Sequence, residues 1–64
     1  MKTETEILEL LKQNTDVTYM IRPGINRRWA IYKPLGDNRA KRIYEDNDKD
    51  NCRRLLKAVN VRYV

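Results

Sequence analysis

The chain opens with an apolar pattern that is typical of an amphipathic helix. Its apolar residues recur at spacings of three and four, which places them on one helix face. They are Ile7, Leu8, Leu10 and Leu11. Thr3 and Glu6 stand three residues apart, the spacing of a capping box, so the pattern predicts a helix over residues 3–13. Asn14 is the expected stop.

Three alternating segments follow this helix. Residues 17–22, 27–33 and 39–45 contain β-branched and aromatic residues in alternation with polar ones, a pattern that predicts strands. Pro and Gly mark the connections, at residues 23–24 and 34–38. Because the connections are short, the simplest arrangement is an antiparallel meander.

A second helix is predicted after the strands. Its apolar residues stand at i, i+3, i+4 and i+7, and they are Cys52, Leu55, Leu56 and Val59. Asp46 or Asn47 is expected to cap its start, and Asn60 suits a left-handed end. Residues 61–64 leave two alternatives open, a short fourth strand or an unpaired tail.

These elements predict the fold class. Each helix offers one apolar stripe, and a sheet needs one face covered. We therefore expect one small α+β domain over residues 1–64, in the order α-β-β-β-α with a final β left open. The sheet is expected to be antiparallel and three-stranded, or four-stranded if the last residues join it, with both helices packed on one face. Trp29 is the expected anchor of the core.

The composition excludes several kinds of site. The chain has no His, no Ser and one cysteine, Cys52, so it can hold neither a zinc site of the nitrogen and sulfur type nor a Ser-His or Cys-His pair. We expect no cofactor, no metal and no enzymatic activity. Cys52 lies on an apolar stripe and is expected to be a buried, inert thiol. A lone cysteine fits a reducing compartment, so we expect a cytoplasmic protein. No apolar run is long enough to span a membrane.

Positive charge is concentrated in the predicted sheet. Residues 17–44 carry seven Lys or Arg against one Asp, a net charge of +6, whereas residues 1–16 sum to −2 and residues 45–64 to +1. If Trp29 and Ile31 face the helices, their neighbours along the strand must face outward, because side chains alternate. The excess charge is therefore expected on the uncovered face of the sheet and at its turns.

This surface suits a nucleic acid. Arginine pairs with phosphate in bidentate fashion, and tyrosine can stack on an unpaired base. The residues expected to face outward are Arg22, Arg28, Tyr32, Arg42 and Tyr44, surrounded by Arg27, Lys33, Arg39 and Lys41. We interpret the chain as a small non-enzymatic nucleic-acid-binding module, with DNA preferred over RNA.

Two other interpretations stay open. The face could be only a solvated one, since Lys and Arg on strands discourage edge-to-edge aggregation. Alternatively, the chain could be a small adaptor or inhibitor of the kind encoded by phages and mobile elements. It would bind an acidic surface of a host protein through the same face or through residues 61–64. The oligomeric state is left open, with a homodimer among the alternatives.

The order of elements also carries a resemblance. Three strands followed by a helix over residues 17–59, with Trp29 and basic strands, resemble the small DNA-binding domains at the N-termini of tyrosine recombinases. Those domains lay a three-stranded sheet in the major groove, so the resemblance implies DNA binding through the sheet. The helix at 3–13 is extra, and the residues YEDNDKDNC before the second helix depart from the pattern. The resemblance therefore assigns no residue.

Overall fold

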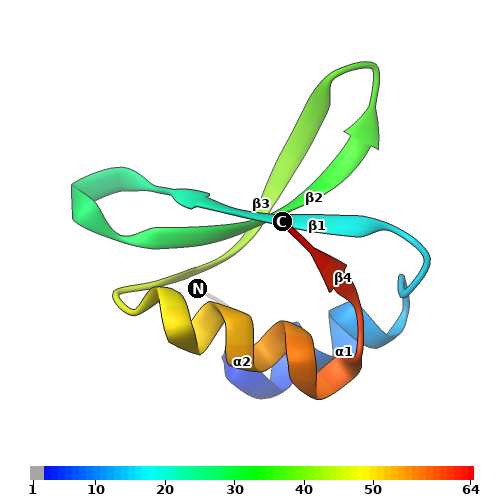
Figure 1. Cartoon of the computed structure of the whole chain (residues 1–64), viewed down its shortest axis with the longest axis horizontal. Helices are drawn as coiled ribbons and strands as arrows, with labels where there is room; N and C mark the ends of the chain where they lie inside the picture. The colour runs from blue at the N-terminus through cyan, green and yellow to red at the C-terminus, as the bar shows by residue number, and fades with distance from the viewer. Residues whose placement is uncertain (1–2) are drawn as a thin grey trace.

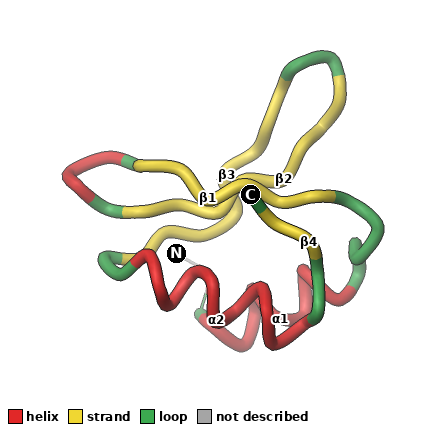
Figure 2. Tube along the Cα trace, in the orientation of Figure 1, coloured by secondary structure: helices red, strands yellow, loops and turns green. Residues whose placement is uncertain are grey.

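Two helices cover one face of a four-stranded sheet. The computed structural model describes residues 3–64. Its elements, in chain order, are α1 (Glu4–Lys12), β1 (Thr18–Pro23), the short 3-10 helix η1 (Ile25–Arg27), β2 (Trp29–Gly36), β3 (Arg39–Asp46), α2 (Lys49–Val59) and β4 (Arg62–Tyr63). Both helices lie on the same side of the sheet (Figure 1), and colouring by secondary structure separates the two layers (Figure 2). The predicted α+β class and element order are confirmed.

The strands lie in the order β3-β2-β1-β4. The pairs β1–β2 and β2–β3 are antiparallel, which confirms the predicted meander. The fourth strand, which the sequence left open, forms beside β1 and runs parallel to it, with Thr18 opposite Arg62 and Tyr19 opposite Tyr63. The sheet is therefore mixed, and β3 and β4 form its two edges.

Helix α1 begins with the predicted capping box. The Thr3 hydroxyl accepts a hydrogen bond from the Glu6 backbone N–H at 3.2 Å, and the Glu6 carboxylate accepts one from the Thr3 N–H at 3.3 Å. Ile7 and Leu11 are fully buried on the apolar stripe. The helix is capped at Gln13, one residue before the expected stop.

Helix α2 begins at Lys49, and its cap differs from the two that we predicted. Asp48 is the N-cap, and its carboxylate accepts from the Asp50 N–H at 2.9 Å. Asp46 is not available for this role, because its own carboxylate accepts from the Asp48 N–H and turns the chain into the helix. Asn60 ends the helix at φ 62°, in the predicted left-handed conformation. Neither helix in residues 3–64 has the length and apolar character needed to cross a membrane.

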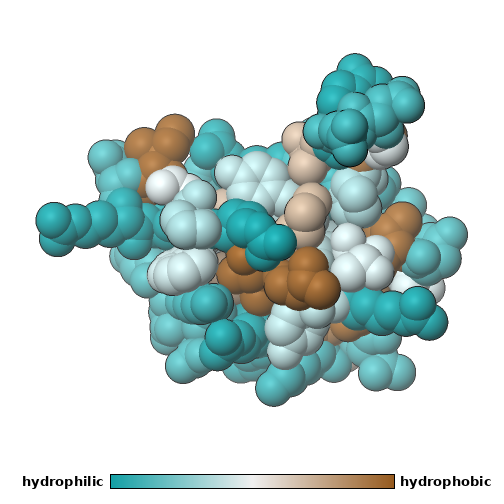
Figure 3. All heavy atoms as spheres, turned by 45° about the horizontal axis from the view of Figure 1, so that its top comes forward, coloured by the Kyte–Doolittle hydropathy of each residue, from teal (hydrophilic) through white to brown (hydrophobic). Residues whose placement is uncertain are grey.

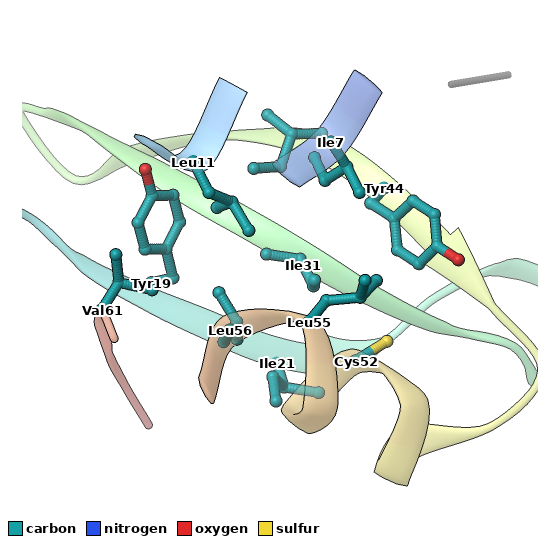
Figure 4. Packing of buried hydrophobic residues seen from close by; sticks show 11 residues of the cluster. Ile7, Leu11, Tyr19, Ile21, Ile31, Tyr44, Cys52, Leu55, Leu56 and Val61 are labelled. Carbon is teal, nitrogen blue, oxygen red and sulfur yellow. The ribbon is translucent and has the colours of Figure 1, made fainter. Parts of the chain in front are cut away.

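The core fills the space between the helices and the sheet. Its members are Ile7, Leu11, Tyr19, Ile21, Ile31, Ile43, Tyr44, Cys52, Leu55, Leu56 and Val61. Tyr19 and Tyr44 lie at opposite ends of this cluster, with Ile31 between them (Figure 4). Trp29 packs against the cluster on the predicted face but stays half-buried, and the Lys49 Nζ lies 4.5 Å from its ring centroid. The centre of the core is Ile31 and not Trp29.

Cys52 is buried, as predicted from the apolar stripe of α2. Burial raises the pKa of its thiol to about 11, and the nearby carboxylates of Asp46 and Asp48 act in the same direction. The thiolate is the reactive form of cysteine, so this thiol is inert at neutral pH.

A bulge in β3 reverses one predicted orientation. Ile31 pairs with Tyr44, whereas the next residue of β2, Tyr32, pairs with Arg42. Ile43 is therefore an extra residue without a partner in the ladder, and the alternation of β3 changes there. Tyr44 faces the helices together with Ile31 and is only 8% exposed. The prediction that Tyr44 points outward is wrong, because it assumed unbroken alternation along this strand.

The hairpin between β2 and β3 is longer than its sequence indicated. Only Asp37 and Asn38 form the turn, with φ values of 52° and 61°, as a type I′ turn requires. The predicted loop over 34–38 is therefore wrong, because residues 34–36 extend β2. Proline is tolerated there since β1 pairing ends opposite Tyr32, so Pro34 has a neighbouring strand on one side only. The hairpin projects away from the helices (Figure 1).

Candidate nucleic-acid interface

The sheet face opposite the helices carries four of the predicted site residues. The register places Arg22 opposite Ala30 and Tyr32 opposite Arg42. Ala30 and Tyr32 are two residues apart on β2 and share a face, which Arg28 joins from the start of the strand. We call the face formed by Arg22, Arg28, Tyr32 and Arg42 the outer face.

The outer face also contains residues that the sequence reasoning did not include. Met20 lies opposite Tyr32, and Glu45 lies opposite Ala30. The alternation that assigned Arg22 already implied Met20, but the position of Glu45 depends on the bulge. Figure 3 shows the molecule after the top of Figure 1 has been turned toward the viewer, and this side is mostly hydrophilic with separate apolar patches. The face therefore does not present a continuous apolar surface.

Glu45 connects two of the arginines. Its carboxylate lies 3.0 Å from the Arg42 Nη1 and 3.9 Å from the Arg28 Nε. It is the one acidic side chain on the outer face among the residues that the structure describes, so the cations outnumber it. Arg42 keeps 42% of its side chain exposed in this pair, and a guanidinium carries five N–H donors. One carboxylate can therefore orient Arg42 and still leave donors for a second anion.

Arg22 lies at the other end of the outer face and is exposed. Its Nη1 donates to the Ile21 carbonyl at 2.9 Å and to the Val64 carbonyl at 3.3 Å. These bonds hold the guanidinium beside β1 and the end of the chain. The outer face thus has one cation, Arg22, on β1 and the Arg28–Arg42 pair on its other side. Ala30 lies between them, and Met20 and Tyr32 form the neighbouring row that ends at Arg42.

The remaining predicted cations surround the outer face and do not lie within it. Lys33 and Lys41 pair with each other on the opposite side of the β2–β3 hairpin from Arg42, and Arg39 starts β3 next to the turn. Because the hairpin extends beyond the helices, this side of it is not covered by them (Figure 1). Arg27 is exposed in the connection between β1 and β2, at a positive φ of 62°. The cations are therefore spread over one face and two hairpin ends.

An open hollow lies along β3. Its volume is about 640 Å³, and it is lined by Leu10, Arg28, Lys41, Arg42, Ile43, Tyr44 and Glu45. Five of these residues are consecutive in the edge strand, and Leu10 comes from α1. Neither Leu10 nor Ile43 was a predicted site residue, and the sequence holds no signal that would bring a helix residue beside an unpaired strand residue.

Tyr44 serves the structure and not the surface. Its hydroxyl donates to the Asp46 carboxylate at 2.8 Å, and the Asn51 amide donates to the same carboxylate. Burial, followed by this hydrogen bond, raises the pKa of Tyr44. Burial also opposes ionisation of Asp46, but hydrogen bonds from the Asp48 backbone, Asn51 and Tyr44 outweigh it and lower the pKa. The phenol thus stays protonated, and the Asp46 carboxylate that it contacts links β3 to Asn51 of α2.

Comparison with known proteins assigns no family to this chain. No family model matches the sequence, and neither the curated proteins nor the solved structures contain a match. The resemblance to the DNA-binding domains of tyrosine recombinases stays a prediction from the order of elements.

Proposed function

We propose that this chain is a non-enzymatic nucleic-acid-binding module whose contact surface is the outer face and the β2–β3 hairpin. The observation that supports the proposal is the convergence of Arg28, Tyr32 and Arg42 on the sheet face that neither α1 nor α2 covers. Sequence positions up to fourteen residues apart supply this cluster, and the strand register brings them together. Tyr44, one of the residues expected in the surface, is not part of it.

The chemistry of the cluster fits a polyanion with aromatic components. The guanidinium of Arg42 is oriented by Glu45 and retains donors for a phosphate oxygen. Tyr32 is half-buried and offers a ring directly beside Arg42 on the outer face. Phosphate contacts would supply most of the affinity, and they would carry no sequence information.

The uneven charge along the chain supports the same proposal. The segment that forms β1, β2 and β3 carries most of the net charge of +5, whereas the segment that contains α1 is net acidic. A polyanion would therefore attract the sheet side and turn the α1 side away. The preference for DNA over RNA is part of the proposal and is supported by the resemblance in element order.

Binding measurements at several salt concentrations test this proposal. Fluorescence anisotropy would report the affinity for labelled duplex DNA, single-stranded DNA and RNA of equal length. We expect binding at low salt that weakens as salt rises, since each phosphate contact releases counterions. The absence of binding to all three at low salt would rule out the proposed function.

A second candidate function is an adaptor or inhibitor that binds an acidic protein. Two exposed apolar side chains favour it, because phosphate binding does not need them. Ile25 is 61% exposed in the β1–β2 connection, and Leu35 is 49% exposed near the end of the β2–β3 hairpin. Affinity capture from a cell extract treated with nuclease separates the two candidates. One protein recovered in stoichiometric amount would favour the adaptor, and recovery of nucleic acid alone from untreated extract would count against it.

A further inference from the structure

The hollow beside β3 is lined by both charged and apolar side chains, a combination that the outer face alone does not offer. Arg28, Lys41 and Arg42 line it with positive charge, and Glu45 supplies one acceptor. Its other walls are apolar and come from Leu10, Ile43 and the small exposed part of Tyr44, which is 8% exposed. A face that serves only to bind phosphates needs no such walls. The volume of about 640 Å³ lies within the range of small-molecule pockets, roughly 300–1,000 Å³.

The bulge explains why the hollow exists at this point of the strand. Ile43 is the extra residue of β3, and a bulge bends the strand that carries it. Ile43 and Tyr44 are therefore adjacent residues that are both buried, which regular alternation on a sheet with one covered face does not produce. Leu10 of α1 is half-buried and completes the apolar side.

We propose that this hollow binds one unpaired nucleotide of a single strand or of an opened duplex. The inference rests on the proposed function and specifies its ligand. A phosphate would face Lys41 and Arg42, and the base would lie against Leu10 and Ile43. Glu45 can accept hydrogen bonds from the amino group of a base, as carboxylates do from cytosine. A base within an intact duplex is stacked on both sides and cannot enter such a hollow.

An extended acidic peptide is the other ligand with a suitable charge, and the structure favours it less. A peptide that pairs with the edge of β3 needs a regular ladder, which the bulge at Ile43 interrupts. Cationic side chains on an edge strand also oppose pairing with another strand.

The test compares one single strand with its own duplex at the same low salt. We expect the wild-type protein to bind the single strand at least about fivefold more tightly, given the usual contribution of one base in contact with a protein surface. Leu10→Ser should remove this preference and leave the affinity for duplex unchanged within about twofold. Leu8→Ser is the matched control, because Leu8 is also a half-buried leucine of α1 but does not line the hollow. It should retain the preference.

A second measurement on the wild-type protein does not depend on the folding of a variant. Titration with a nucleoside monophosphate, followed by NMR, should shift the amides of residues 41–45 and of Leu10. Equal affinity for single strand and duplex, or equal effects of the two serine variants, would overturn the inference and leave the proposed function intact. Displacement of the monophosphate by an oligoglutamate peptide, with no effect of single-stranded DNA, would overturn it in favour of a protein ligand. No binding of any nucleic acid would instead contradict the proposed function itself.

Discussion

Residues of the same type have different environments on the two faces of the sheet, and Tyr32 and Tyr44 show this most clearly. Both tyrosines belong to the β2–β3 hairpin, and both follow an isoleucine in the sequence. Tyr32 lies on the outer face opposite Arg42, where it is half-buried. Tyr44 lies on the inner face opposite Ile31, and its hydroxyl is bound by Asp46. One unpaired residue, Ile43, produces the difference.

The strand register, and not the residue type, therefore decides which tyrosine can reach a ligand. Along β2 the side chains alternate without interruption from Arg28 to Tyr32, so their orientation follows from counting. Along β3 the same counting of alternate residues gives the correct side-chain orientation only on one side of the bulge at Ile43. A tyrosine ring is therefore part of the core in β3 and part of the candidate interface in β2.

The largest expected effect comes from truncating the two tyrosines in turn. Tyr44→Ala should lower the free energy of unfolding by about 3–5 kcal/mol, as for other large aromatic residues removed from a core. In a domain of this size that loss is expected to leave much of the protein unfolded. Tyr32→Ala should cost about 1 kcal/mol, close to the average of single substitutions. Urea denaturation followed by circular dichroism measures both, and equal losses would contradict the assignment of faces.

Replacement of a cation on each side of the molecule tests the outer face as a binding surface. Arg42→Ala should weaken binding to nucleic acid and reduce the slope of log affinity against log salt by about one. The substitution removes one positive charge from the outer face. It also leaves the Glu45 carboxylate without its partner at 3.0 Å, so less of its negative charge is neutralised. Lys57→Ala, an exposed cation of α2, should change neither quantity. If both variants weaken binding alike, the cations act only through net charge.

A smaller effect is expected from removing only the two hydroxyls. Tyr44→Phe should lower the free energy of unfolding by about 1 kcal/mol, the usual worth of a hydrogen bond between side chains in a folded protein. Tyr32→Phe should change it by less than about 0.5 kcal/mol, as is common at surface positions. Thermal and urea denaturation of the two variants provide the comparison. A larger loss for Tyr32→Phe would mean that its hydroxyl has a structural partner.

The last effect is a decline in stability at alkaline pH, and it should come from the inner face. The pKa of Cys52 rises from 9.0 to about 11, and burial and the Asp46 carboxylate also raise the pKa of Tyr44. Because the folded state holds these protons more tightly, stability is complete below pH 9 and falls as pH rises toward 11. Urea midpoints measured at half-unit steps of pH would show this decline. Cys52→Ala should make it shallower, and an unchanged slope would show that the thiol does not contribute.

Much of the fold could be predicted from the sequence, because local signals were strong. The capping box at Thr3, the apolar stripe of α2 and the stop at Asn60 each depend on residues close in the chain. The pairing of β4 with β1 could not be predicted, since two residues give too short a pattern. The turn at Asp37 and Asn38 was predicted only as part of a longer loop over 34–38, because the nearby Pro and Gly are strong turn signals in the sequence.

The candidate site was predictable only as far as alternation held. Arg28 and Tyr32 follow from the regular strand β2. Tyr44 was misplaced and Glu45 was missed because no sequence signal marks the bulge, which forms when Ile43 and Tyr44 are both buried. The hollow depends on the packing of α1 beside β3, a contact between residues more than thirty positions apart.

The outer face is the surface proposed to bind nucleic acid, and mapping the contact by NMR tests this proposal most directly. Amide shifts would be recorded at low salt while a short DNA duplex is added to the labelled protein. We predict that the largest shifts fall on Met20, Tyr32 and Arg42 and on the β2–β3 hairpin, with the exposed side of α2 unchanged. Shifts concentrated on α2 around Arg54 and Lys57, or no shifts at any position, would contradict it.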